Sequence, residues 1–90
     1  MINIDFDSAK NDKNILERNL NFERVQEFDF ETATFTIDDR FDYGETRIRA
    51  LGFIEKRLYA LVFVETDNGI RVISFRKANK REVKQYENKS

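Results

Sequence analysis

The stretch LYALVFV, residues 58–64, limits the possible folds of this chain more than any other feature. Its side chains are apolar on both faces of an extended segment, which is typical of a central strand that is covered on both sides. The chain has 90 residues, enough for one small domain spanning residues 1–90. We therefore expect a single domain built around a sheet in which this strand is central.

Four other segments have the alternation or the β-prone residues of strands, at residues 2–6, 33–37, 46–54 and 70–77. The first is short and is expected at an edge of the sheet. In the second, Ala33, Phe35 and Ile37 share one face. The sequence DNG, residues 67–69, predicts a tight hairpin before the last strand, because Asn-Gly supplies the positive φ angles that such a turn needs.

Three helices are predicted from capping residues and apolar spacing, at residues 8–19, at residues 22–28 and after Asn79. In the first helix, Ala9, Leu16 and Leu20 form a thin apolar stripe on one face, which we expect to meet the core. In the last, Asn79 is followed three residues later by Glu82, which resembles a capping box.

These elements predict an α+β fold, with an antiparallel sheet of about four strands plus a short N-terminal strand, two N-terminal helices and one C-terminal helix. We expect the helices at both ends of the chain to cover one face of the sheet and to leave the other face partly open. No proline, repeat or low-complexity segment interrupts this order.

The composition excludes several kinds of chemistry. The chain has no cysteine and no histidine, which removes disulfides, thiolate metal sites, the usual proton shuttle at neutral pH and the commonest nitrogen ligand of zinc. The acidic loop DDRFDYG, residues 38–44, lacks the ligand spacing of a calcium loop. We therefore expect neither a metal site nor a cofactor.

Two further features predict a cytoplasmic protein without membrane contact. The sequence contains no run of about 18 apolar residues, the length needed to span a bilayer. Its first ten residues, MINIDFDSAK, are acidic, unlike the basic and then apolar start of a signal peptide.

Charge is divided unevenly along the chain. Residues 1–45 carry five cations and twelve acids, a net charge of −7, whereas residues 46–90 carry eleven cations and five acids, a net charge of +6. A basic side of the folded molecule would favour an anionic partner, above all nucleic acid. Alternatively, the two halves neutralise each other through salt bridges.

A group of cations marks the point where the last strand is followed by the last helix, in VISFRKANKRE, residues 72–82. Its members are Arg76, Lys77, Lys80 and Arg81. Cations beside the backbone N–H groups of a helix N-terminus suit a phosphate, so we expect these side chains to gather into a pocket sized for a phosphodiester. The alternative is a solvated rim of ion pairs with Glu45, Glu55 or Glu65.

Side chains alternate between the two faces of a strand, which decides which arginines can meet. Arg47 and Arg49 share one face of the strand at residues 46–54. In a regular last strand Arg71 and Arg76 point to opposite faces, so they meet only if a bulge intervenes.

Four stretches resemble the BrnT toxin family, small ribonuclease toxins of bacterial type II toxin–antitoxin systems. They are DFDSAKNDKN (residues 5–14), NLNFERV (19–25), DDRFDYGETRIRALGF (38–53) and GIRVISFRKANKREVKQYE (69–87). The last is the most specific, because the run Arg-x-Ile-Ser-x-Arg-Lys-Ala, then Arg-Glu and Tyr-Glu, stand at the family's spacings.

The resemblance implies a RelE-like fold, metal-independent cleavage of RNA by transesterification, inhibition of translation, and a hetero-oligomer with a cognate antitoxin. In such chemistry Glu45 or an activated Lys77 would be the base, and Arg47 and Arg76 would clamp the phosphate. The residues that would hold the RNA are Arg49, Arg71, Lys80, Arg81 and Lys84.

The chain departs from the family pattern after Asn14 of the first helix. At that spacing the family usually has Lys-His-Gly, whereas this chain has Glu17-Arg18-Asn19, and Phe6, before the helix, stands in place of the more usual tryptophan. The alternative function is therefore that of a catalytically weak or inactive relative, which binds RNA or an antitoxin without cleavage.

Overall fold

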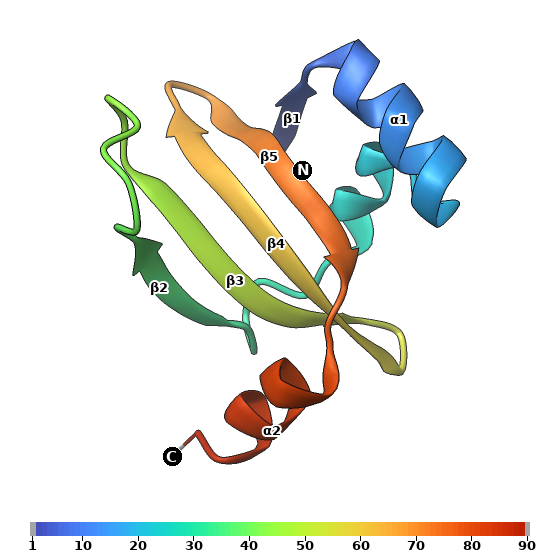
Figure 1. The fold of residues 1–90 in the computed structure, drawn as a ribbon, viewed down its shortest axis with the longest axis vertical. Helices are drawn as coiled ribbons and strands as arrows, with labels where there is room; N and C mark the ends of the chain where they lie inside the picture. Colours follow the sequence, from blue (N-terminus) through green and yellow to red (C-terminus); the bar gives the residue numbers. More distant parts are fainter. Residues whose placement is uncertain (1, 90) are drawn as a thin grey trace.

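The computed structural model describes residues 2–89, and its elements follow the predicted order (Figure 1). They are β1 (Asn3–Phe6), α1 (Ser8–Arg18), the 3₁₀ helix η1 (Phe22–Glu27), β2 (Thr34–Asp38), β3 (Arg47–Ile54), β4 (Arg57–Thr66), β5 (Gly69–Lys77) and α2 (Lys80–Glu87). The three helices begin at side-chain caps from Asp7, Asn21 and Asn79, and the capping box with Glu82 is present. No helix within residues 2–89 is long and apolar enough to cross a membrane.

The strands form one mixed sheet in the order β1-β5-β4-β3-β2. The pairs β2–β3, β3–β4 and β4–β5 are antiparallel, and β1 runs parallel to β5 at the predicted edge. β4 is central, because β3 and β5 flank it and most of its residues from Leu58 to Phe63 are buried. The α+β class and the central place of the LYALVFV strand are therefore confirmed.

Gly69 is needed for a reason other than the predicted one. Within residues 2–89, positive φ angles occur only at Asn19, Gly44 and Glu55. The prediction of positive φ angles in the DNG turn is therefore wrong. A Cβ atom on Gly69 would instead lie 2.0 Å from the backbone oxygen of Asn3. The glycine therefore allows β1 to approach β5 closely enough to pair with it.

The hydrophobic core lies between one face of the sheet and the segment around η1. Phe22, Val25 and Phe28 of this segment pack in one buried cluster with Leu61 of β4 and Phe75 of β5. Burying side chains of this size contributes about 1.5–3 kcal/mol each. This cluster fixes the sheet face that the N-terminal helices cover.

α1 is attached to the core by amide side chains and not by the predicted apolar stripe. Asn11 and Asn14 are 8 % and 4 % exposed, and Asn14 Nδ2 donates to the backbone oxygens of Leu20 and Phe75, at 3.0 Å each. Leu16, expected in the core, is 87 % exposed. Of the three residues predicted for the stripe, Leu20 is buried in the core, whereas Ala9 and Leu16 are exposed, because these hydrogen bonds orient the helix with its asparagines inward.

α2 lies on the opposite face of the sheet, so the expectation that all helices cover one face is also wrong (Figure 1). The ring of Tyr86 packs edge-on against Phe53 of β3, with centroids 5.3 Å apart. Phe53 alternates with Gly52 and Ile54, which are buried on the core side. α2 covers only one end of this second face, called the open face below.

Candidate nucleic-acid interface

A β-bulge in β5 decides which arginines reach the open face. The pairing of β5 with β4 shifts by one residue at Ile73, which has no partner in β4. The extra residue reverses the alternation of side chains, so that Val72 and Phe75 are both buried in the core. Arg71 and Arg76 consequently share the open face, the arrangement that a regular strand would not allow.

β3 supplies Arg47 and Arg49 to the same face. The regular alternation of β3 places both of them there, as the sequence predicts. Arg49 lies opposite Val62 of β4, and Arg76 lies opposite Ala60. The two arginines therefore flank the central strand from its two sides.

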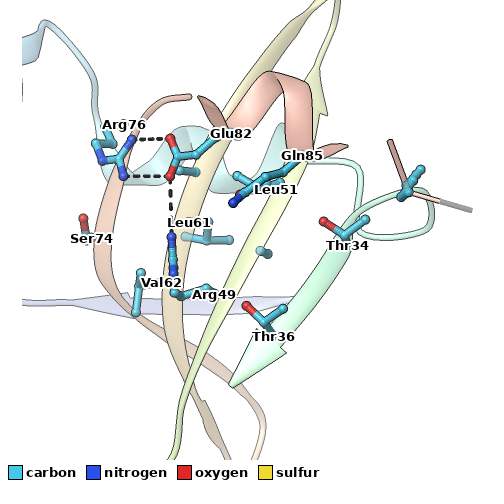
Figure 2. A pocket seen from close by; sticks show the side chains of 13 residues that line it. Thr34, Thr36, Arg49, Leu51, Leu61, Val62, Ser74, Arg76, Glu82 and Gln85 are labelled. Atoms are coloured by element: carbon cyan, nitrogen blue, oxygen red, sulfur yellow. Dashed lines mark hydrogen bonds and ion pairs between the residues drawn. The ribbon is translucent and has the colours of Figure 1, made fainter. Parts of the chain in front are cut away.

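The open face is hollowed into a cavity of about 370 Å³ between the sheet and α2 (Figure 2). Strands β2 and β5 supply the hydroxyls of Thr34, Thr36 and Ser74, and α2 supplies one wall. Arg49 and Arg76 line the cavity together with Glu82, and Figure 2 shows both arginines pointing toward that carboxylate. Two of the predicted site residues therefore share this cavity with a carboxylate from α2.

Glu82 holds the two guanidinium groups together. Arg76 binds it through two hydrogen bonds, Nη1 to Oε1 at 2.7 Å and Nη2 to Oε2 at 2.9 Å. Arg49 Nη2 lies 3.6 Å from Oε2, and the backbone N–H of Asn79 donates to Oε1 at 2.9 Å. The buried carboxylate thus caps α2 and orders both arginines at once.

This cluster keeps a positive charge that can face a ligand. The hydrogen bonds from Arg76 lower the pKa of Glu82 below its usual value, so the carboxylate is ionised at neutral pH. One carboxylate against two guanidinium groups leaves a formal charge of +1. The side chains of Arg76 and Arg49 are still 35 % and 42 % exposed, so an anion can reach both.

A second cluster lies on the same face around Glu45. Arg71 Nη2 lies 2.6 Å from Glu45 Oε1, and Arg47 Nε lies 3.4 Å from Oε2. The guanidinium of Arg47 also stacks 3.9 Å above the ring of Tyr43. Arg71 holds the pKa of Glu45 below its usual value, and Arg47 adds to this effect. The cluster has the same composition as the first, with two arginines sharing one carboxylate.

The remaining predicted cations do not enter either cluster. Lys77 lies opposite Tyr59 in β4, whose side chain is buried on the core side. The side chain of Lys77 therefore points to the sheet face opposite that of Arg76. The exposed residues of α2 in this group are Lys80, Arg81 and Lys84. Of the four cations at the strand–helix junction, Arg76 is therefore the one that lines the cavity.

Glu82 is the site residue that the sequence did not reveal. Its place three residues after Asn79 predicted a helix cap and nothing more. Its second role depends on α2 lying over the open face, which no local pattern encodes. The alternative prediction, a rim of ion pairs, involved other glutamates. Of these, Glu45 does form ion pairs with arginines.

The acidic loop after β2 is organised by an arginine. Arg40 donates to both carboxylate oxygens of Asp38, at 2.8 and 3.0 Å, and thereby lowers the pKa of Asp38. Within residues 2–89 no group of three or more acidic side chains is placed to hold a metal ion. The ionic contacts of this loop are thus internal.

The structure is that of a small α+β protein whose open sheet face carries arginines in a polar cavity, a surface suited to an anion. Residues 6–82 match the family described as the ribonuclease toxin BrnT of type II toxin–antitoxin systems. The chain belongs to this family of ribonuclease toxins, and membership implies a cognate antitoxin as partner. A search of the curated proteins found no match.

Proposed function

We propose that this chain cleaves RNA without a metal ion and thereby inhibits translation. In the reaction, the 2′-OH of one ribose attacks the adjacent phosphorus, its proton passes to a base, and the P–O5′ bond breaks as the leaving oxygen takes up a proton. The products are a 2′,3′-cyclic phosphate and a 5′-hydroxyl. Beside family membership, the observation that carries the proposal is the pair of guanidinium groups, from Arg49 and Arg76, in one cavity.

Arg76 and Arg49 are proposed to stabilise the phosphoryl oxygens, which gain negative charge as the 2′-oxygen attacks. A guanidinium group offers a planar fork of N–H donors that matches two phosphate oxygens. Arg71 and Arg76 lie opposite Val64 and Ala60, positions that are roughly 13 Å apart along a strand. We therefore propose that the scissile phosphate lies between the two clusters, where the long side chains of Arg49 and Arg76 reach it from one side and Glu45 lies beside the attacking 2′-OH on the other.

Glu45 is the better of the two bases that the sequence suggested. It lies beside arginines of the open face, whereas Lys77 lies on the other side of the sheet. In the free protein Arg71 lowers the pKa of Glu45 and weakens it as a base. A phosphate that draws the arginines away would raise this pKa toward its usual value and strengthen the base. The exposed cations Lys80, Arg81 and Lys84 would attract the RNA backbone.

The direct test is to incubate the purified chain with single-stranded RNA in the presence of EDTA. We expect cleavage products that end in a 2′,3′-cyclic phosphate, together with growth arrest when the chain is expressed alone. Because the proposed transesterification uses only groups of the protein, the chelator should leave the rate unchanged. Intact RNA under these conditions, with normal growth on expression, would reject the proposed activity.

Glu82 is expected to compete with RNA phosphate for its two arginines. Glu82→Gln removes the competing charge, so affinity for a short RNA should rise by roughly fivefold, equivalent to about 1 kcal/mol. The slope of log K against log salt should steepen by roughly 0.7, the value for one further phosphate contact on a single strand. Fluorescence anisotropy at several salt concentrations measures both quantities.

Glu87→Gln is the matched control, because it removes one negative charge from an exposed position of the same helix. It should change affinity much less than Glu82→Gln. Circular dichroism checks that α2 remains folded in both variants. Weaker RNA binding by a folded Glu82→Gln protein would mean that Glu82 positions the arginines for RNA and does not compete with it.

A second function is favoured by the carboxylates that occupy both arginine clusters. With Arg18 in the place of the family's histidine, the chain could bind RNA or its antitoxin without cleaving RNA. RNA binding that weakens steeply with salt, with no products after prolonged incubation, would support this function over the first.

A further inference from the structure

The β2 edge, residues 34–38, is an unprotected edge of the sheet. β2 pairs only with β3, so the backbone groups on its outer side have no strand partner within residues 2–89 (Figure 1). Phe35 and Ile37 are 48 % and 60 % exposed. Proteins usually protect such edges with charged side chains, proline or a bulge. This strand, TFTID, has no proline or bulge, and its one charged side chain, Asp38, is buried and bound to Arg40. The β2 edge is therefore a ready template for another strand.

The opposite edge of the sheet differs in that its apolar side chains are covered. β1 has only four residues, and its apolar side chains, Ile4 and Phe6, pack against the core. The side chain of Gln26 also covers its start, with Nε2 donating to the backbone oxygen of Ile2 at 2.7 Å. The exposure of apolar side chains at the β2 edge is thus a local feature and not a general property of the sheet.

The exposed side chains of β2 continue the apolar surface of the core. Phe35 lies opposite Ala50 of β3, which is buried in the core, and Ile37 lies opposite Ile48, which packs against it. Both therefore lie on the core side of the sheet, beyond the part that the N-terminal helices cover. A strand added to β2 with apolar residues on this side would extend the core outward.

Charge indicates what kind of strand the β2 edge can accept. Residues 29–42 contain five acids and one cation, a net charge of −4. Arg40 is bound to Asp38, whereas Asp39 and Asp42 are exposed and make no ion pair within residues 2–89. Pairing of two copies at this edge would bring two such acidic segments together, which like-charge repulsion opposes. A basic segment is favoured for the same reason.

We propose that the β2 edge docks a basic, extended segment of the cognate antitoxin, which pairs with β2 as a sixth strand. The segment would place apolar side chains beside Phe35 and Ile37, and lysines or arginines near Asp39 and Asp42. The backbone hydrogen bonds would give affinity, and the alternating side chains would give specificity. The proposal rests on family membership and concerns a surface separate from the arginine clusters, so it does not depend on RNA cleavage.

The test uses the full chain and the antitoxin expressed from the adjacent reading frame. Ile37→Lys introduces a cation and removes an apolar contact, and we expect it to weaken binding at least tenfold in calorimetric titration. Leu16→Lys is the matched control, because it makes the same kind of change at an exposed apolar position of α1. In the wild-type complex, amides of residues 34–38 should gain protection from hydrogen exchange.

Several results would overturn the proposal. They are an unchanged affinity of Ile37→Lys, protection that is confined to other strands, and a dimer of the chain alone that Ile37→Lys dissociates. The dimer would assign the β2 edge to a second copy. Phe35→Lys, on the same face, repeats the test if Ile37→Lys fails to fold. Because binding is the readout, failure of the ribonuclease proposal would leave these outcomes interpretable.

Discussion

Arg76→Ala should lower the rate of RNA cleavage by about 10²- to 10³-fold, the effect of removing one preorganised donor from a developing oxyanion. Arg76 is the predicted clamp that lies in the cavity of the open face, with both Nη atoms ordered by Glu82. Loss of a group that acts mainly in the transition state should appear in kcat more than in KM. Single-turnover kinetics with a defined RNA measures the chemical step separately from product release.

Two variants separate this effect from a loss of structure or of charge. Arg57→Ala removes an exposed arginine at the start of β4, outside both clusters, and should leave the rate within about twofold of the wild type. Arg76→Lys keeps a cation beside Glu82 but loses the planar fork, so it should fold normally and remain well below wild-type activity. A folded Arg76→Ala protein with normal kcat would exclude this arginine as the phosphate clamp.

Glu45→Gln addresses the proposed base in the same assay. It removes the group that would accept the 2′-OH proton, so kcat should fall by about 10²-fold or more. RNA affinity should not fall with it, because Arg47 and Arg71 would then lose a competing carboxylate. An unchanged kcat would mean that a group other than Glu45 accepts the 2′-OH proton.

Local signals in the sequence predicted the elements of this fold well. The caps at Asp7 and Asn79 depend on a side chain and backbone N–H groups within three residues, so they can be inferred from short stretches. The alternation in β3 likewise placed Arg47 and Arg49 on one face. Such features follow from geometry within one element and need no knowledge of the rest of the chain.

The features that assemble the candidate site are not local. The bulge at Ile73, which brings Arg71 and Arg76 to one face, follows from how β5 fits beside β4, and the sequence left it open. The position of α2 over the open face gives Glu82 its place among the arginines. Tertiary contacts choose the face against which a short helix packs, so a pattern within the helix could not supply this information.

The orientation of α1 gives the largest difference between pattern and structure, and it leads to the second prediction. Asn14→Ala should lower the free energy of unfolding by about 3 kcal/mol, whereas Leu16→Ala should change it by less than about 0.5 kcal/mol. Asn14 is buried and donates to the backbone oxygens of Leu20 and Phe75, and both would lose this donor. Its Oδ1 also accepts from Arg18.

Urea unfolding of both variants measures the difference, with unchanged m-values as evidence that the midpoints report stability. Leu16→Ala is the control in the same helix, because Leu16 is exposed and its replacement improves helix propensity slightly. Amphipathic spacing predicts the opposite order, with the leucine more costly to lose than the asparagine. A larger loss for Leu16→Ala would therefore mean that α1 packs by its apolar stripe and that the asparagines do not orient it.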